Sequence, residues 1–248
     1  HYAVSVLRTA RVALPLREKA AGDSAVLSEL LPGDPVEVFE LAEHRAWGQS
    51  RVDGTVGHFA TEELGPELPP ATHLITAISA SLTAEPYPDA PACGTLPMGA
   101  QVHGTPGPEG YLDTQLGYLS TGDLRAIDAP AGSPADWAET MLGIPYRPGG
   151  RSGAGVDAGG MIFLAHQLAG VRVPRFTDLQ AAEIGVAFDP AAPLRRGDLL
   201  FFASGALIMA DADTAIHVSE GHGVVKQPLE TAIESGALGA VIAYRRTA

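Results

Sequence analysis

The segment Asp157-Ala158-Gly159-Gly160 stands where a helix should begin, so a side chain at position 158 would occupy the first helical turn. Asp157 can serve as the N-cap, apolar residues recur at helical spacing from Met161 to Leu168, and Gly170 stands where a helix-ending glycine would lie. A cysteine thiol in that turn would face unpaired backbone N–H groups and the positive end of the helix dipole, which favour the nucleophilic thiolate. Alanine at position 158 offers no such chemistry.

A histidine that could act as a general base lies in a second expected element. Residues 215–219 predict a strand with His217 at its centre. If Gly221-His222-Gly223 forms a three-residue hairpin loop, Gln227 lies directly across from His217 on the returning strand, and His222 is exposed at the tip. In the alternative interpretation, His217 is a structural histidine and Gln227 is a polar residue of an edge strand.

Loops and helix caps position these elements. Residues 142–153 are dense in glycine and proline, which excludes a helix or a central strand there. Residues 194–202 predict a turn that leads into a buried strand. The segment Ser133-Pro134-Ala135-Asp136, which follows the linker at residues 129–132, predicts a helix start with serine as the N-cap, proline at N1 and aspartate at N3.

The chain ahead of this region contains an internal repeat. Residues 56–64 (VGHFATEEL) recur as residues 116–124 (LGYLSTGDL), which predicts two copies of one module. Short alternating runs such as residues 35–39, separated by turn residues at close spacing, are typical of a small β-barrel. Residues 65–70 (GPELPP) separate the two copies. We therefore expect three domains, at residues 1–66, 67–128 and 129–248.

Several dispersed motifs resemble the NlpC/P60 family of bacterial cell-wall cysteine peptidases. In chain order they are Gly143-Ile144-Pro145-Tyr146, Gly149-Gly150-Arg151-Ser152, the helix start Asp157-Ala158-Gly159-Gly160, Pro174-Arg175, Gln180, Arg196-Gly197-Asp198-Leu199-Leu200-Phe201-Phe202 and His217-Val218. The resemblance implies a papain-like α+β domain. It also implies an activity, cleavage of the bond between D-γ-glutamate and a diamino acid in murein stem peptides.

The family's catalytic set consists of a cysteine, a histidine and a third polar residue. Carried over by position, the resemblance puts Ala158 in the nucleophile's place, His217 in the general base's place and Gln227 in the place of the orienting residue. A chain with alanine in the nucleophile's place is inactive by this mechanism.

The resemblance also implies a substrate pocket. The residues that it places near the peptide are Tyr146, Asp157, Gly159 and Thr177. Gly159 replaces the family's usual serine, and the usual Tyr-x-Trp-Gly-Gly reads Tyr146-Arg147-Pro148-Gly149-Gly150 here. Tyr146 could instead be a loop anchor that packs its ring. An engineered knockout normally changes one residue, so these further departures favour a natural loss of activity over an engineered Cys-to-Ala change.

The two repeats resemble bacterial SH3 domains. Residues 30–34, Trp47 and residues 53–57 fit the first copy well, whereas the second copy fits more loosely. Two such barrels followed by an NlpC/P60 domain are similar to the γ-D-glutamyl-L-diamino acid endopeptidases, so the resemblance covers nearly the whole chain. Trp47 is expected to belong to the barrel core.

Composition limits the partners. A formal net charge of -13 at pH 7 disfavours nucleic acid and anionic polymers, whereas a small peptide is compatible with it. The eight histidines show no metal-ligand spacing, and we expect no metal and no cofactor. Cys93 is the single cysteine, so no internal disulfide is expected. No signal peptide or transmembrane run is visible, and the chain starts without methionine; we expect the cell envelope or secretion, with a cytoplasmic location left open.

Three functions stay open at this point. The first is a non-catalytic homologue that binds murein stem peptides, peptidoglycan fragments or a protein partner. The second is a γ-D-glutamyl-diamino acid endopeptidase that carries an engineered Cys-to-Ala change at position 158. The third is a structural or adhesive wall protein that acts through its SH3-like barrels.

Overall fold

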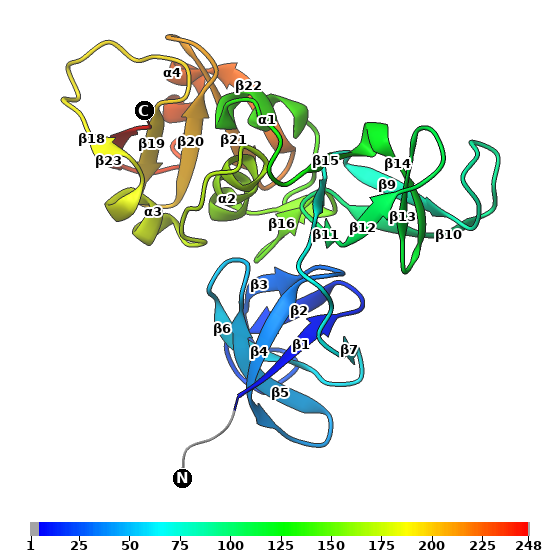
Figure 1. The fold of residues 1–248 in the computed structure, drawn as a ribbon. Helices are drawn as coiled ribbons and strands as arrows, with labels where there is room; N and C mark the ends of the chain where they lie inside the picture. Colours follow the sequence, from blue (N-terminus) through cyan, green and yellow to red (C-terminus); the bar gives the residue numbers. More distant parts are fainter. Residues whose placement is uncertain (1–4, 248) are drawn as a thin grey trace. The chain divides into compact units, whose positions relative to one another are not determined.

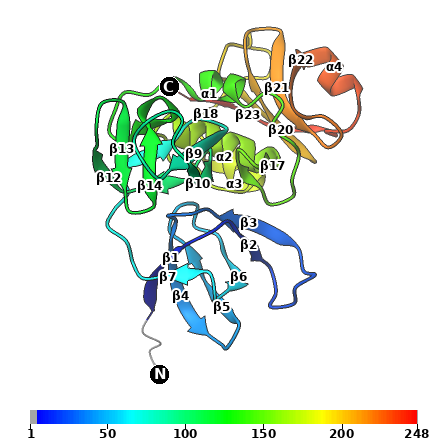
Figure 2. The same cartoon turned by 90° about the vertical axis from the view of Figure 1, so that its right-hand side faces the viewer.

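A computed structural model describes residues 5–247, and the chain forms two compact units (Figures 1 and 2). The first unit takes in the chain up to Ala129 together with the short segment Ser152–Ala154. The second takes in Pro130–Arg151 and Gly155–Ala248. The first unit is built from strands, and the second combines helices with one large sheet.

Residues 6–65 form a seven-stranded antiparallel sheet in the order β3-β2-β6-β5-β4-β1-β7. Alternate residues of β4 point into the core, as the alternating sequence of residues 35–39 predicts. Leu16, Val36 and Phe59 are buried in this core. The strands are β1 (Val6–Ala10), β2 (Leu14–Arg17), β3 (Val26–Leu30), β4 (Pro35–Leu41), β5 (Arg45–Ser50), β6 (Val56–Ala60) and β7 (Leu64–Gly65).

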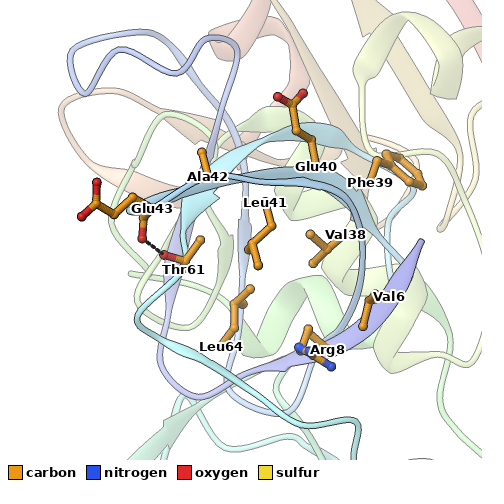
Figure 3. A pocket seen from close by; sticks show the side chains of 10 residues that line it. All are labelled: Val6, Arg8, Val38, Phe39, Glu40, Leu41, Ala42, Glu43, Thr61 and Leu64. Carbon is orange, nitrogen blue, oxygen red and sulfur yellow. Dashed lines mark hydrogen bonds between the residues drawn. The ribbon is translucent and has the colours of Figure 1, made fainter. Parts of the chain in front are cut away.

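Trp47 lies outside this core, so its expected burial in the barrel is wrong. Its side chain is 40% exposed on β5 and packs edge-on against Phe39, with ring centroids 5.3 Å apart. Phe39 also lines a shallow groove of about 460 Å³, whose walls include Leu41 and Leu64 (Figure 3). Trp47 pairs with Glu40 of β4, directly after a β-bulge where the register shifts between Val38 and Glu40.

Residues 73–126 form two smaller sheets around a separate core. The five-stranded sheet has the order β10-β9-β14-β13-β12, and the three-stranded sheet has the order β11-β8-β15. Ile75, Leu96 and Leu119 are buried between these strands. The elements are β8 (His73–Ile75), β9 (Ser79–Thr83), β10 (Ala92–Pro97), β11 (Gln101–Val102), β12 (Gly104–Pro106), β13 (Tyr111–Thr114), β14 (Gly117–Ser120), the 3₁₀ helix η1 (Thr121–Asp123) and β15 (Leu124–Ala126).

The second unit is organised around a six-stranded antiparallel sheet in the order β18-β23-β19-β20-β21-β22. Helix α2 packs against β20 and β21, and α1 packs against α2. The elements are α1 (Pro134–Thr140), β16 (Arg151–Ser152), β17 (Gly155–Val156), α2 (Ala158–Leu168), α3 (Thr177–Glu183), β18 (Val186–Ala187), β19 (Leu199–Phe202), β20 (Gly205–Met209), β21 (Thr214–Ser219), β22 (Gly223–Pro228), α4 (Leu229–Glu234) and β23 (Val241–Arg246).

The expected helix ends are confirmed. Ser133 and Asp136 form a reciprocal capping box at the start of α1, with Pro134 in the first turn. Asp157 caps α2, whose apolar residues are buried nearly all round because the helix lies between the sheet and α1. Gly170 follows the C-cap with φ of 77°, a left-handed conformation that glycine adopts without a steric cost. The buried strand expected within residues 194–202 is β19, and all four of its residues are buried.

Candidate functional site

Position 158 is the first residue of α2, and Ala158 lines an open cleft of about 580 Å³ in the second unit. The cleft is also lined by Tyr146, Asp157, Gly159 and Thr177, so the structure brings together all four residues expected to contact a peptide. They come from three separate segments: the loop before β16, the start of α2 and the start of α3. A thiol at position 158 would lie in the first turn of a helix, where the dipole favours an anion.

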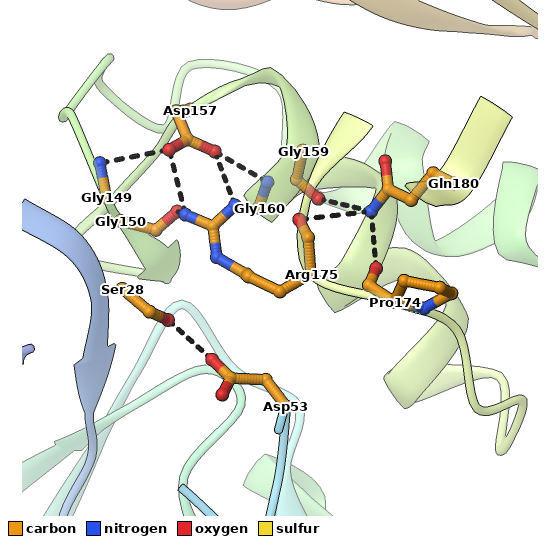
Figure 4. A network of polar contacts seen from close by, with 10 residues as sticks. All are labelled: Ser28, Asp53, Gly149, Gly150, Asp157, Gly159, Gly160, Pro174, Arg175 and Gln180. Atoms are coloured by element: carbon orange, nitrogen blue, oxygen red, sulfur yellow. Dashed lines mark hydrogen bonds and ion pairs between the residues drawn. The ribbon is translucent and has the colours of Figure 1, made fainter. Parts of the chain in front are cut away.

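The Asp157 carboxylate is held by four hydrogen bonds (Figure 4). The backbone N–H groups of Gly149 and Gly160 donate to it over 2.9 and 2.7 Å. The Arg175 guanidinium donates two more, over 2.9 and 2.8 Å, and its side chain is only 2% exposed. Asp157 therefore links the start of α2 to the loop at Gly149 and to Arg175. It has this structural role in addition to the expected contact with a peptide.

Gln180 ties the segment before α3 to the first turn of α2. It is fully buried, and its Nε2 lies 2.9 Å from the carbonyl oxygen of Gly159 and 2.8 Å from that of Pro174 (Figure 4). Gln180 and Arg175 carried the family resemblance in the sequence but were not expected as site residues. Their side chains support the cleft wall through contacts that only the folded chain reveals.

Gly159 lies against the backbone of Arg175. A Cβ atom at position 159 would stand 2.7 Å from the Arg175 carbonyl oxygen and 3.4 Å from Cγ2 of Thr177. Real Cβ atoms do not approach backbone oxygens so closely, so a serine there would require this segment to move. The cleft wall is fitted to glycine at this position.

His217 and Gln227 contact each other, but in a register that differs from the expected one. The loop of the β21–β22 hairpin comprises Glu220, Gly221 and His222, so His217 pairs with Val225 and Gln227 pairs with Ala215. The expectation that Gln227 lies directly across from His217 is therefore wrong by two residues. Because the strand period is two, Gln227 stays on the same face, and its Nε2 lies 2.9 Å from Nε2 of His217.

A glycine at the start of β22 explains the shift of the loop. Gly223 has φ of 73° and approaches the Ile144 carbonyl too closely to admit a Cβ atom. This contact with a distant segment places Gly223 in the strand, paired with Ser219, rather than in the loop. His222 is exposed at the tip, as expected.

The imidazole of His217 is 5% exposed, and burial lowers its pKa from the ordinary value of 6.5, although a hydrogen bond to the Val218 carbonyl acts in the opposite direction. At neutral pH the ring is therefore a neutral base. His217 and Gln227 are not among the residues that line the cleft, but Val218, the next residue of β21, is. The structure thus holds a buried, neutral imidazole on β21 and, at position 158, no group that a base could activate.

Tyr146 and Glu220 both line the cleft. Burial raises the pKa of the Tyr146 phenol above 10.0, and the charges of Glu220 and Asp157 and a hydrogen bond to Glu220 raise it further. The phenol is therefore a neutral hydrogen-bond donor at physiological pH. Glu220 was not expected in the site, because its role depends on a contact between the hairpin loop and a distant segment.

Among residues 5–247, no cluster of histidine, cysteine or carboxylate side chains has the arrangement of a metal site. Within the same residues, no helix combines the length and the apolar character needed to cross a bilayer. Cys93 is an exposed free thiol in the first unit, apart from the residues that line this cleft.

Comparison with known proteins identifies the families of the two domains. A sequence profile of the NlpC/P60 family matches residues 143–240, and a profile of the bacterial dipeptidyl-peptidase SH3 domain matches residues 16–64. The chain is 32% identical over 122 residues to a probable endopeptidase of Corynebacterium glutamicum, a match that covers 45% of this chain and 54% of that protein. It is 34% identical over 90 residues to a γ-D-glutamyl-L-lysine dipeptidyl-peptidase of Bacillus subtilis, which covers 35% of this chain and 29% of that protein. The matches thus span about half or less of these relatives.

Solved structures show the fold. A crystal structure of an NlpC/P60 family protein from Bacillus cereus superposes with a TM-score of 0.83 at 18% identity, covering 97% of this chain and 99% of that one. An NlpC/P60 endopeptidase from Photobacterium damselae has a TM-score of 0.64 at 12% identity, covering 98% and 71%. These similarities confirm the expected α+β fold class. The chain carries an NlpC/P60 domain at residues 143–240 and, ahead of it, a bacterial SH3 domain at residues 16–64.

Proposed function

We propose that this protein binds murein stem peptides of the L-Ala-γ-D-Glu-diamino acid type in the cleft of its NlpC/P60 domain and does not cleave them. The observation that carries the proposal is Ala158, which lines an open cleft of about 580 Å³ at the start of α2, in the place that the family resemblance gives to the nucleophile. A methyl group cannot attack a carbonyl carbon. The cleft therefore has room for a peptide but lacks the nucleophilic sulfur that would cleave it.

The close packing around Gly159 supports a natural origin for the alanine at position 158. A single engineered Cys-to-Ala change would leave the neighbouring family serine in place, together with room for its Cβ atom. Here the neighbour is glycine, and the Arg175 carbonyl oxygen lies where a serine at 159 would need space. The replacement at 159 and the packing around it belong together, as expected for a chain that diverged from catalysis over many substitutions.

A specific observation favours a second candidate, a γ-D-glutamyl-diamino acid endopeptidase in which only the thiol has been replaced. His217 and Gln227 are in hydrogen-bond contact, 2.9 Å apart, and burial keeps the imidazole neutral. Turning the Gln227 amide so that its oxygen accepts from Nε2–H would free Nδ1 to act as a base, which is the arrangement of a base and its orienting residue. If catalysis lacks only the thiol, Ala158→Cys should hydrolyse L-Ala-γ-D-Glu-L-Lys between the second and third residues, whereas the non-catalytic proposal expects no turnover.

The proposal is tested by calorimetric titration of the intact chain with L-Ala-γ-D-Glu-L-Lys, whose γ-D-Glu-L-Lys part is in the name of the Bacillus subtilis relative. We expect saturable binding that Tyr146→Ala weakens. Tyr87→Ala is the matched control, since this tyrosine is exposed in the first unit and does not line the cleft. Tyr146 is a cleaner probe than Asp157, which also caps α2. No saturable binding would contradict the proposal and would leave a structural or adhesive role of the SH3-like domains.

A peptidoglycan-derived ligand implies action where such fragments occur. Membership of a cell-wall hydrolase family supports the cell envelope or the exterior as the location. The net charge of -13 disfavours nucleic acid as a partner, because phosphate backbones are bound by clustered lysine and arginine.

A further inference from the structure

We propose that the first unit carries a separate docking site, a groove along the edge strand β10 that takes up an acidic, apolar segment of a partner protein as an added strand. The site does not depend on the cleft of the NlpC/P60 domain. The groove has a volume of about 610 Å³, and its walls include residues 93–97 of β10 and residues 11–13. We call it the β10 groove.

The β10 groove runs along the edge of a sheet. In the order β10-β9-β14-β13-β12, β10 is the terminal strand and pairs with β9 alone. Side chains alternate between the two faces of a strand, so a hollow over one face would be lined by every second residue. Five consecutive residues of β10 line this groove. It therefore follows the edge of the strand, where unpaired backbone groups can accept another strand.

The main-chain groups of Thr95 point outward from this edge. Thr95 pairs with Ser81, and in an antiparallel ladder hydrogen-bonded pairs alternate with pairs whose N–H and C=O groups face away from each other. In the same register, the Met98 N–H donates to the Ile78 carbonyl oxygen over 3.1 Å, so Thr95, three residues earlier, is at an outward position. Pro97, which has no N–H, is at another. Among residues 5–247, no group outside the ladder bonds to the main chain of Thr95, which is exposed.

Exposed apolar side chains gather around the same groove. Val12, Ile78 and Leu116 line it, and they are 41%, 46% and 54% exposed. Single exposed apolar residues are ordinary, but several that share one groove are typical of a surface that binds another protein. In strand addition, main-chain hydrogen bonds supply affinity, and alternate side chains of the added segment contact the receptor. The β10 groove offers both kinds of contact.

The charge of the β10 groove favours an acidic segment. Arg11 is its single arginine or lysine, and none of the chain's 29 aspartate and glutamate residues is among the described residues that line it. Within residues 5–247, the Arg11 side chain has no ion pair. Exposed charges further away than about 8 Å are largely screened at physiological ionic strength, so the local cation outweighs the negative net charge. A carboxylate of the added segment can therefore pair with Arg11.

A second copy of this chain is a poorer occupant. Two copies paired edge to edge through β10 would form an isologous contact, in which the same groove meets itself. Arg11 would then find no carboxylate, because the described lining of the groove contains none. The net charge of -13 on each copy also opposes their association. An acidic segment of a different protein has neither disadvantage.

The charge is tested by NMR titration of the intact ¹⁵N-labelled chain with two capped peptides, Ac-Val-Asp-Val-Asp-Val-NH2 and Ac-Val-Asn-Val-Asn-Val-NH2. We expect saturable shifts of the Thr95 amide resonance with the aspartate peptide and about tenfold weaker binding of the asparagine peptide, or 1.4 kcal/mol. Arg11→Gln should give the two peptides the same Kd. Arg8→Gln is the matched control, since this exposed arginine lies outside the β10 groove, and it should keep the difference.

The added strand is tested by Thr95→Pro, which removes the outward N–H and should abolish saturable binding. Proline is tolerated on edge strands where the N–H faces solvent, so the variant should keep the dispersed spectrum of a folded chain. Thr95→Val keeps the N–H and should retain binding. The resonances of neighbouring β10 residues report binding in both variants.

Four results would overturn the inference. One is the absence of saturable binding of the aspartate peptide, and another is an equal Kd for both peptides in the unmodified chain. The third is unchanged binding in Thr95→Pro, because the peptide would then not pair with the edge of β10. The fourth is a dimer of the unmodified chain that Thr95→Pro dissociates in sedimentation, because a second copy would then occupy the groove.

Discussion

Nε2 of Gln227 lies 2.9 Å from Nε2 of His217, although the Cα partner of His217 in the hairpin is Val225. The contact is diagonal across two antiparallel strands, between side chains on the same face. Nδ1 of His217 lies 3.3 Å from the Val218 carbonyl oxygen. With the proton on Nδ1, that nitrogen donates to the carbonyl, and Nε2 accepts from the Gln227 amide, so both ring nitrogens have a partner.

Gln227→Glu should raise the pKa of His217 by about 1 or more, because a carboxylate beside a buried imidazole stabilises its protonated form. In the unmodified chain the pKa of His217 is lowered by burial from 6.5. A pH titration of the His217 ring resonances by NMR measures both values. Gln115→Glu, at an exposed position of the first unit, should leave the pKa of His217 unchanged. The same pKa in Gln227→Glu and the unmodified chain would contradict the contact.

The stability of the second unit should decrease as the pH falls below about 6.5. Burial lowers the pKa of both His217 and His166 from 6.5, so the unfolded chain takes up protons at a pH where the folded chain does not. The loss begins at the unfolded value and levels off below the folded values. Urea unfolding at pH 7.5 and pH 5.5 measures it. His166→Gln should reduce the difference in the free energy of unfolding between the two pH values; an unchanged difference would show that His166 is not the cause.

Gly159→Ser should destabilise the second unit by about 1 to 3 kcal/mol, as overpacking does in other protein interiors. The added Cβ would stand 2.7 Å from the Arg175 carbonyl oxygen, which is backbone and cannot simply rotate away. Gly221→Ser is the matched control: no atom lies within 4 Å of a Cβ built there, and the change should stay within about 0.5 kcal/mol. Equal free energies of unfolding for the two variants would mean that the cleft wall accepts a serine at 159.

Local signals in the sequence were sufficient for the frame of the site. The N-caps Ser133 and Asp157, the glycine after α2 and the strand around His217 all depend on neighbours a few residues away. The five residues expected at the nucleophile's place and around the peptide, which included Ala158 and Tyr146, line one cleft. Their roles toward a ligand stay predictions.

Contacts between distant segments were not accessible from local patterns. The hairpin loop moved by one residue because Gly223 is held against Ile144, a contact across the fold. The hydrogen bonds between Arg175 and Asp157 join residues 18 positions apart. The Tyr146–Glu220 contact depends on the position of the β21–β22 hairpin loop, to which Glu220 belongs. Trp47 was expected in the barrel core, but a bulge in the adjacent strand accompanies its exposure.

Asp136 should titrate with a pKa of about 2, well below its ordinary value of 3.8, because a hydrogen bond from Arg196 and the capping contacts with Ser133 stabilise its carboxylate. Its contribution to stability is therefore present above pH 3.8 and is lost as the pH falls through about 2. Carboxyl chemical shifts measured between pH 1.5 and 5 report the pKa. Arg196→Gln should return it toward 3.8, and a pKa near 3.8 in the unmodified chain would contradict this ion pair.

Arg175→Met should destabilise the second unit much more than Arg196→Met does. Arg175 is 2% exposed and its partner Asp157 is 26% exposed, so removal of the guanidinium leaves a largely desolvated carboxylate with only its two backbone donors. We expect a loss of about 3 kcal/mol, near the lower end of the range for broken buried pairs. Arg196 is 38% exposed, and the loss of its contacts with Asp136 and Glu139 should cost about 1 kcal/mol or less.

Salt separates the two cases further. Ions screen exposed pairs, so the loss of unfolding free energy caused by Arg196→Met should be smaller at 1 M NaCl than at 0.05 M. At 1 M the Debye length is only about 3 Å. The effect of Arg175→Met should persist, because the Arg175 side chain is only 2% exposed and salt ions cannot reach it. Urea unfolding of both variants at the two salt concentrations makes the comparison. A salt-sensitive loss at Arg175, or equal losses at the two sites, would mean that Asp157 is open to solvent and does not lock the start of α2.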